Sequence, residues 1–167
     1  KGTTLSMKTN RPGWTTPAVP IHKAIKQGCP LAPLLFAIVM DELHRSYRKV
    51  GGYTMHTGEV VSSRGYCDDT AILAGDMDTL RQLNDVTVEF FTRHRLQVSL
   101  RKTYLTGREA NGGEIEGKVW WPGMTKPIKT VPQTEAIRYL GAYISMDLDW
   151  STQIGKMNSS VMNVVSH

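Results

Sequence analysis

Residues 65–74 read GYCDDTAILA, a stretch in which two adjacent aspartates separate two runs of small and β-forming residues. The first run ends at Tyr66 and the second begins at Thr70, which predicts two strands with Asp68 and Asp69 at the tip between them. Adjacent carboxylates repel each other unless a cation neutralises them, and a hard divalent ion does so with oxygen ligands. An ordinary Asp-rich turn is the alternative, and the aspartate pair taken alone favours it.

Helices are predicted on both sides of this stretch. Upstream, apolar residues recur at helical spacing over Leu31–Leu43. Downstream, a helix is predicted over Met77–His94, with Asp76 as its N-terminal cap. A last helix begins near Ser151 with Asp149 as cap, and four apolar residues share one of its faces: Trp150, Ile154, Met157 and Val161.

Short β-strands are predicted for much of the remaining chain. The opening segment, Gly2–Ile25, is rich in Thr and Pro and predicts extended strands and turns rather than helix. Further strands are predicted at Tyr53–Thr57, Glu59–Tyr66, Thr70–Ala74, Gln97–Leu100, Thr103–Thr106, Lys118–Trp121 and Ile137–Ile144. Helices that alternate with antiparallel hairpins indicate an α+β fold.

Composition and charge narrow the class of protein. The 167 residues are 40% apolar and 21% charged, which excludes a disordered or collagen-like chain. No apolar run approaches the roughly 20 residues that a membrane helix needs. Residues 1–65 carry nine Lys and Arg against three Asp and Glu, whereas residues 66–100 carry three against six. An acidic middle beside a basic flank suits a metal site within a polyanion-binding surface, and two differently charged solvated faces are the alternative.

Cysteine and histidine usage adds two expectations. Two cysteines, Cys29 and Cys67, make no disulfide framework, so we expect reduced thiols in an intracellular protein, in a nuclear, cytoplasmic or organellar compartment. The five histidines have no metal-ligand spacing, so no zinc site is predicted.

Four motifs, spread in order over residues 25–150, resemble those of reverse transcriptases of non-LTR retrotransposons. Each motif is weak alone, and their order makes the resemblance specific. The Tyr-x-Asp-Asp motif of that family resembles Tyr66–Asp69, and its Gln-Gly-x-Pro-Leu-Ser-Pro element resembles Ile25–Phe36. The family's strand that ends in Lys-Thr resembles Leu96–Thr103. Its Tyr-Leu-Gly hairpin resembles Arg138–Ile144, and Asp147–Trp150 follows that hairpin.

The resemblance implies a reverse-transcriptase palm with part of the fingers and the start of the thumb. The expected fold is an α+β, palm-like antiparallel sheet with packed helices, truncated at its N-terminal side. Residues 1–135 would form the partial fingers and palm, and residues 136–167 a primer-grip-like hairpin and the start of a thumb helix. Trp120 and Trp121 would pack against that helix, or stack on bases. Cys67 stands where the family has a small or apolar residue, which predicts a buried thiol.

The resemblance also implies three groups of site residues. The expected catalytic residues are Asp68, Asp69 and Lys102, with Mg²⁺ or Mn²⁺ held by Asp68 and Asp69. The expected nucleotide and template pocket comprises Gln27, Gly28 and Tyr66, and the expected primer grip comprises Leu140 and Gly141. A metal stabilises the attacking and leaving oxygens of phosphoryl transfer, and a lysine stabilises charge on the leaving group.

One departure from the family pattern concerns the catalytic set. The family has a further metal-binding aspartate before the Gln-Gly element, yet no Asp or Glu precedes Asp41 here. We therefore expect a reverse-transcriptase fragment, inactive alone, that acts on an RNA template and a DNA primer once another protein segment or chain completes the palm. The alternative is a domesticated, inactive domain that serves as a structural or RNA-binding subunit of a larger assembly, bound to a structural RNA. No membrane partner is expected.

Overall fold

The computed structural model describes residues 3–5, 19–21, 30–109 and 111–165. The chain divides into two compact units, Lys1–Glu42 and Leu43–His167, and each is considered by itself. In the first unit, strand β1 (Thr3–Leu5) pairs antiparallel with β2 (Val19–Ile21), in agreement with the predicted extended opening. The predicted boundary between residues 135 and 136 stays a prediction.

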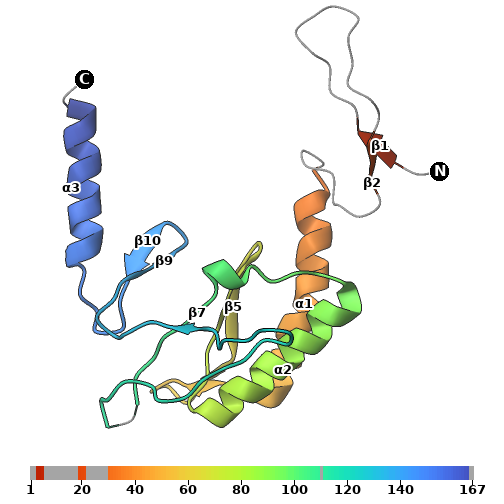
Figure 1. Ribbon diagram of the computed structural model, residues 1–167, viewed down its shortest axis with the longest axis horizontal. Helices are drawn as coiled ribbons and strands as arrows, with labels where there is room; N and C mark the ends of the chain where they lie inside the picture. Colours follow the sequence, from red (N-terminus) through yellow and green to blue (C-terminus); the bar gives the residue numbers. More distant parts are fainter. Residues whose placement is uncertain (1–2, 6–18, 22–29, 110, 166–167) are drawn as a thin grey trace, which may run out of the picture. The chain divides into compact units, whose positions relative to one another are not determined.

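Helix α1 (Ala32–Val50) begins in the first unit and continues into the second (Figure 1). Its predicted apolar stripe divides into two parts. Leu34 and Ile38 are more than half exposed, whereas Leu43 and Tyr47 are completely buried. The amphipathic pattern therefore predicts the helix correctly but not how much of its face is covered.

The strands of the described residues form two-stranded pairs rather than one broad sheet. In the second unit most pairs are antiparallel, whereas one pair is parallel. The antiparallel pairs are β3 (Tyr53–Thr54) with β4 (Val60–Val61), β5 (Ser63–Tyr66) with β6 (Asp69–Ile72), and β9 (Ile137–Tyr139) with β10 (Ala142–Ile144); the parallel pair is β7 (Tyr104–Leu105) with β8 (Lys129–Thr130). Helices with small antiparallel pairs agree with the predicted α+β class.

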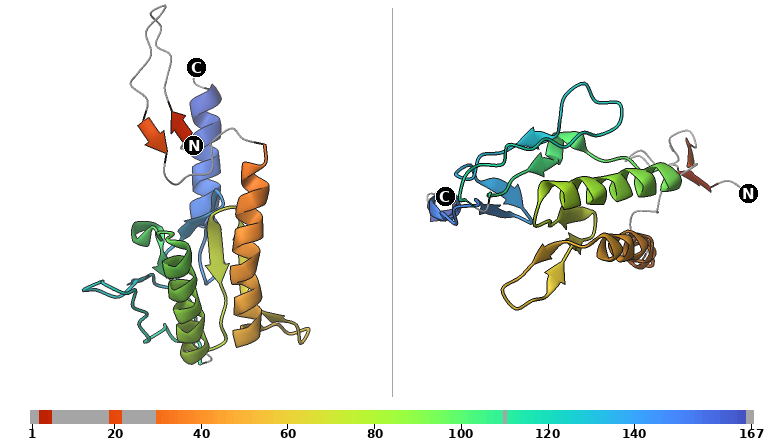
Figure 2. Two further views of the ribbon diagram at one scale, coloured as in Figure 1. Left: turned by 90° about the vertical axis from the view of Figure 1, so that its right-hand side faces the viewer. Right: turned by 90° about the horizontal axis from the view of Figure 1, so that it is seen from below.

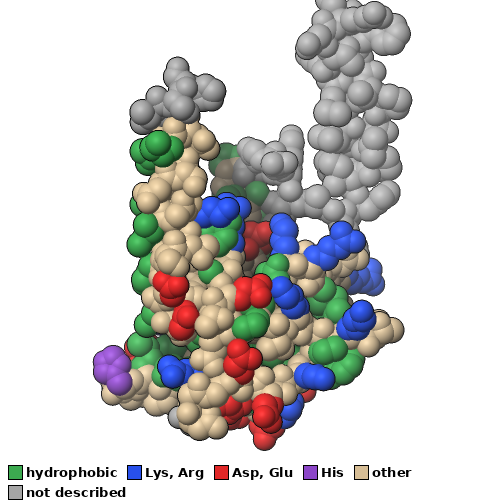
Figure 3. All heavy atoms as spheres, turned by 60° about the vertical axis from the view of Figure 1, so that its left-hand side comes forward, with side chains coloured by type: hydrophobic (Ala, Val, Ile, Leu, Met, Phe, Trp, Pro, Cys, Tyr) green, Lys and Arg blue, Asp and Glu red, His purple; other side chains and the backbone are tan. Residues whose placement is uncertain are grey.

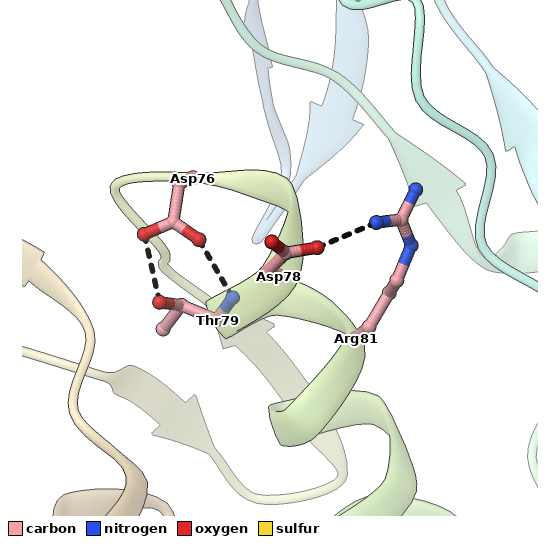
Figure 4. Close-up of polar contacts among 4 residues, drawn as sticks. All are labelled: Asp76, Asp78, Thr79 and Arg81. Carbon is pink, nitrogen blue, oxygen red and sulfur yellow. Dashed lines mark hydrogen bonds and ion pairs between the residues drawn. The ribbon is translucent and has the colours of Figure 1, made fainter.

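Helix α2 (Met77–His94) has the predicted bounds and the predicted cap. The Asp76 carboxylate accepts hydrogen bonds from the backbone N–H of Thr79 at 2.7 Å and from its hydroxyl at 2.8 Å (Figure 4). These bonds satisfy a donor that a helix start leaves unpaired, and they lower the pKa of Asp76. In the first turn, Asp78 and Arg81 form an exposed ion pair at 2.7 Å.

The core of the second unit forms around one face of α2. Leu83, Thr87 and Phe90 are buried on that face. The Tyr47 hydroxyl and Thr87 Oγ1 share a buried hydrogen bond of 2.7 Å, which ties the C-terminal half of α1 to α2, and the right-hand view of Figure 2 shows α2 lengthwise and α1 nearly end-on. A second apolar cluster packs beside the start of α2 and comprises Leu105, Val119 and Ile128 with Met77, Leu80 and Ile115.

Two predicted strands are wrong. Gln97–Leu100 forms no strand, and the chain instead makes a short 3₁₀-helix, η1 (Leu100–Lys102). Lys118–Trp121 is irregular, with the Val119 carbonyl accepting the Ile128 N–H at 2.8 Å. The β-forming residues of Lys118–Trp121 thus accompany burial of one side chain, Val119, without a strand ladder.

The tryptophan pair contacts α2, and its predicted packing against the C-terminal helix stays a prediction. Trp121 meets Phe91 of α2 edge to face, with ring centroids 6.3 Å apart. Trp120 is half exposed, and its carbonyl accepts a hydrogen bond from Asn84 of α2. Both tryptophans of this loop thus contact α2, which sequence spacing did not indicate.

The C-terminal part contains the β9–β10 hairpin and helix α3 (Ser151–Val165). As predicted, the Asp149 carboxylate accepts from the N–H and hydroxyl of Ser151, at 2.9 and 2.7 Å. Gln153 Oε1 accepts the Tyr143 N–H at 2.8 Å and ties α3 to β10. Hydrophobic side chains lie exposed along α3 (Figure 3). Within the described residues, no helix has the length and apolar character to cross a membrane.

Candidate functional site

The β5–β6 hairpin carries the adjacent aspartates. Tyr66 pairs with Asp69, so that Cys67 and Asp68 form a two-residue loop. Cys67 has a φ of 52°, in the left-handed region that a residue with a side chain enters at a cost of roughly 1–2 kcal/mol. Asp68 therefore lies in the turn, as predicted, whereas Asp69 is already the first residue of β6, one residue before the predicted start of that strand.

A second hairpin turn faces this tip. Tyr139 pairs with Ala142, and the loop between them has positive φ at both Leu140 (49°) and Gly141 (86°). This is the geometry of the tight turns that join twisted antiparallel strands. Leucine rarely adopts such a φ, and the turn presents its half-exposed side chain outward.

The two turns line one hollow with a volume of about 610 Å³. Its lining residues are Tyr66, Cys67, Asp68, Asp69, Leu140 and Gly141. The fold thus brings together the predicted metal carboxylates, one predicted pocket residue and the predicted primer grip, although about seventy residues separate the two turns in sequence.

Other predicted site residues lie elsewhere. Lys102 is exposed at the end of η1 and does not line the hollow. Gln27 and Gly28 lie outside the described residues, so their predicted place in the pocket stays a prediction. The buried thiol predicted at Cys67 is wrong, because the tight turn leaves this side chain exposed.

The side chains at the tip of the hairpin offer the oxygen ligands that a hard divalent cation prefers. Asp68 and Asp69 are both exposed carboxylates that line the hollow, and Mg²⁺ and Mn²⁺ prefer oxygen ligands. No group of three His, Cys, Asp or Glu side chains that could hold a metal ion occurs in the part of the chain that the structure describes. Two carboxylates with water ligands are therefore what these residues offer.

Sequence reasoning missed the contact behind the hairpin. His44 Nδ1 of α1 and Ser63 Oγ of β5 share a hydrogen bond of 2.7 Å. A Cβ at Gly65 would lie 2.7 Å from His44 Nε2, so the imidazole occupies the space of an absent side chain. A glycine inside a predicted strand was the available signal, since it often marks such a close approach.

Comparison with known proteins agrees with the motifs. Residues 5–144 match the reverse transcriptase (RNA-dependent DNA polymerase) family. The Pol polyprotein of the type-2 retrotransposable element R2DM of Drosophila melanogaster is 26% identical over 136 residues, which are 79% of this chain and 13% of that protein. The Pol polyprotein of the type-1 retrotransposable element R2 of Popillia japonica is 31% identical over 145 residues, 81% of this chain and 19% of that protein.

The chain therefore spans less than a fifth of the length of either relative. The family match covers most of the chain and includes both hairpins that line the hollow. This chain belongs to the reverse transcriptase (RNA-dependent DNA polymerase) family, in the type found in non-LTR retrotransposons.

Proposed function

We propose that this chain contributes the polymerase site of a reverse transcriptase, at which a nucleotide is added to a DNA primer on an RNA template. The observation that carries the proposal is the single hollow between the Asp68–Asp69 turn and the Leu140–Gly141 turn. Such a hollow offers acidic metal ligands on one side and an exposed apolar turn on the other. A primer end held by the second turn would lie beside the carboxylates of the first.

Reverse transcriptases use divalent metal ions, and here Asp68 and Asp69 would hold the ion, with Mg²⁺ or Mn²⁺ suited to their oxygen atoms. When bound, the metal stabilises charge on the attacking and leaving oxygens of the phosphoryl transfer. The sequence has no Asp or Glu before Asp41, and the described residues supply no third ligand at this site. We therefore propose that a further carboxylate from outside this sequence completes the metal site.

The remaining residues of the hollow suit nucleic acid. The Tyr66 side chain is 66% exposed and offers an aromatic face for a sugar or base. Leu140 is half exposed beside it and offers an apolar contact to the primer end. Lys102 lies outside the hollow, so its proposed role at the triphosphate requires the nucleotide to extend toward η1.

Binding to a primer–template duplex tests the proposal before any chemistry. We expect a fluorescein-labelled DNA primer on an RNA template to bind weakly, with an affinity that falls steeply between low and physiological salt, because neutralised phosphates release counterions. In 5 mM Mg²⁺ at low salt, Leu140→Ser weakens this binding, and Val161→Ser, an exposed apolar residue on α3, is the matched control. Absence of binding at low salt, or equal effects of the two variants, contradicts the proposal.

Primer extension separates the proposed enzyme from its alternative. A non-catalytic RNA-binding domain is favoured by one observation, namely that the described residues bring together only two metal-ligating carboxylates. We expect no extension by this chain alone, and extension that requires Asp68 when a longer polypeptide containing it supplies the third carboxylate. A longer polypeptide that binds RNA but never extends a primer supports the non-catalytic domain.

A further inference from the structure

We propose that His44 is a positioning residue that holds the Asp68–Asp69 turn in place from behind. This inference rests on the proposed function, because it concerns the carboxylates assigned there to the metal. His44 itself does not line the hollow. It acts on the site through β5, the strand that leads into the turn.

The imidazole of His44 follows the inner face of β5. Its Nδ1 shares the 2.7 Å hydrogen bond with Ser63 Oγ, and its Nε2 and Cε1 lie 2.7 and 3.0 Å from the place where a Cβ of Gly65 would be. Ser63 and Gly65 are two positions apart, and side chains of a strand alternate between its faces, so both positions face the ring. Tyr66, the next residue, faces away and lines the hollow. The contact thus lies one residue before the turn.

The hairpin needs such a support. β5 and β6 form a two-stranded sheet in the described part of the chain, with no third strand beside them. An isolated two-stranded hairpin is marginally stable in water, so packing must fix its direction. The left-handed φ of Cys67 adds strain at the tip, and strained conformations persist only where their surroundings hold them.

The base of this support lies in the buried core of the second unit. Leu43 and Tyr47, the neighbours of His44 on α1, are completely buried, and the Tyr47 and His44 rings meet edge to face with centroids 6.0 Å apart. Tyr47 is hydrogen-bonded to Thr87 of α2. A continuous path of contacts therefore leads from α2 through Tyr47 and His44 to β5 and its turn.

Gly65 and His44 make this inference testable as a pair. Gly65 has no positive φ, so alanine is acceptable to the backbone and only the imidazole stands in its way. Gly65→Ala should disturb the hairpin when His44 is present. Its effect should disappear in the His44→Ala background, where the added methyl group has room.

The first measurement follows the turn without a metal. A nitroxide label on the exposed Cys67 thiol, in a Cys29→Ser background, reports the mobility of the tip in its electron spin resonance spectrum. We expect sharper lines, which indicate a more mobile label, in His44→Ala and in Gly65→Ala. His44→Gln should restore the spectrum toward that of the parent protein. In the His44→Ala background, Gly65→Ala should add no further effect. The matched controls, His56→Ala and Gly75→Ala, leave the spectrum unchanged, since His56 is exposed and a Cβ at Gly75 meets only an ordinary contact of 3.7 Å.

Circular dichroism identifies variants that lose the fold. If His44→Ala is one of them, label mobility is measured in Ser63→Ala and Gly65→Ala, which also disturb the His44 contact. Unchanged label mobility in folded variants that break the His44 contact overturns the inference. So does a Gly65→Ala effect of the same size with and without His44.

The second measurement connects the support to the proposed metal site. Removal of a residue that orients metal ligands typically weakens binding by about tenfold or more, so we expect His44→Ala to weaken Mn²⁺ binding by about tenfold in unlabelled protein. Asp68→Asn separates the two claims. If Asp68→Asn leaves Mn²⁺ affinity unchanged, the proposed metal site is wrong. If Asp68→Asn weakens Mn²⁺ binding and His44→Ala does not, the positioning role is wrong and the proposed function stands.

Discussion

The tip of the β5–β6 hairpin and the helical scaffold behind it obey different constraints. At the tip, Tyr66 is two-thirds exposed and Cys67 has a left-handed backbone. In the scaffold, Leu43, Tyr47 and Leu83 are completely buried. Packing therefore determines the scaffold, whereas little packing opposes a change of side chain at the tip. Substitutions in the scaffold should lower the free energy of unfolding, and substitutions at the tip should change binding while the fold persists.

The largest expected loss follows from Leu83→Ala in α2. A leucine with no exposed surface leaves a cavity when truncated, so the free energy of unfolding should fall by about 3–4 kcal/mol. Urea denaturation followed by circular dichroism measures this change. Met162→Ala on α3, where the side chain is 67% exposed, is the control and should change stability by less than about 0.5 kcal/mol. Similar losses in both variants would contradict the division into scaffold and surface.

The next effect depends on pH and involves Tyr47. Burial raises the pKa of Tyr47 to about 12, against a smaller opposing effect of its hydrogen bond with Thr87. Above pH 10 the unfolded chain loses this proton while the folded chain keeps it, so stability falls as pH rises from 10 toward 12. The expected loss is about 2 kcal/mol over that interval and approaches about 3 kcal/mol once the folded chain has lost the proton too, since each pKa unit corresponds to about 1.4 kcal/mol.

Tyr47→Phe checks this assignment. At pH 7 it should cost only about 1 kcal/mol, because Thr87 still donates to the Leu83 carbonyl at 2.8 Å. Between pH 10 and 12 its stability should decline less steeply than that of the parent protein. Parallel declines in the two proteins would assign the alkaline sensitivity to other residues.

Sequence reasoning worked best where one local rule decided the structure. The bounds of α2 follow from its apolar period and from Asp76, whose carboxylate has its partner three residues away. The hairpin around Asp68 follows from β-forming residues on both sides, although its turn is one residue shorter than predicted because Asp69 belongs to β6. In each case the interactions that decide the element lie within a few residues of it.

Long-range contacts account for what sequence reasoning missed. The irregular backbone around Val119 is set by its hydrogen bond to Ile128 and by the cluster with Leu105, which no local pattern encodes. The fit of His44 against Gly65 joins residues on different elements. The sequence predicted the two motifs that line the hollow but not the hollow itself, because their proximity depends on the fold of the residues between them.

A smaller effect is expected at the start of α2. Asp76→Ala removes the cap, and the loss of one cap should lower Tm by about 2–4 °C in a chain of this size. The hydrogen bonds from Thr79 lower the pKa of Asp76 in the folded state, so its stabilisation is present above the ordinary pKa and is lost as pH falls through the folded value. Asp78→Ala, which breaks only an exposed ion pair, should shift Tm less. Thermal unfolding at pH 7 and pH 3 compares them.

The smallest expected change in stability is a gain at the second turn. The left-handed φ of Leu140 costs the folded chain roughly 1–2 kcal/mol, and Leu140→Gly removes this cost. Glycine also has more conformational freedom in the unfolded chain, which offsets about half of the gain. We expect a net gain of about 0.5 kcal/mol, together with weaker binding of the primer–template duplex. A gain without loss of binding would remove Leu140 from the proposed primer grip.

A Mn²⁺ titration followed by water-proton relaxation tests whether Asp68 and Asp69 hold a divalent metal. We expect a weak site in this chain that Asp68→Asn and Asp69→Asn each weaken further, with no loss of Tm because both carboxylates are exposed. Asp78→Asn is the control carboxylate and should leave the titration unchanged. Equal Mn²⁺ binding by the parent protein and by Asp68→Asn would show that these carboxylates do not hold the metal.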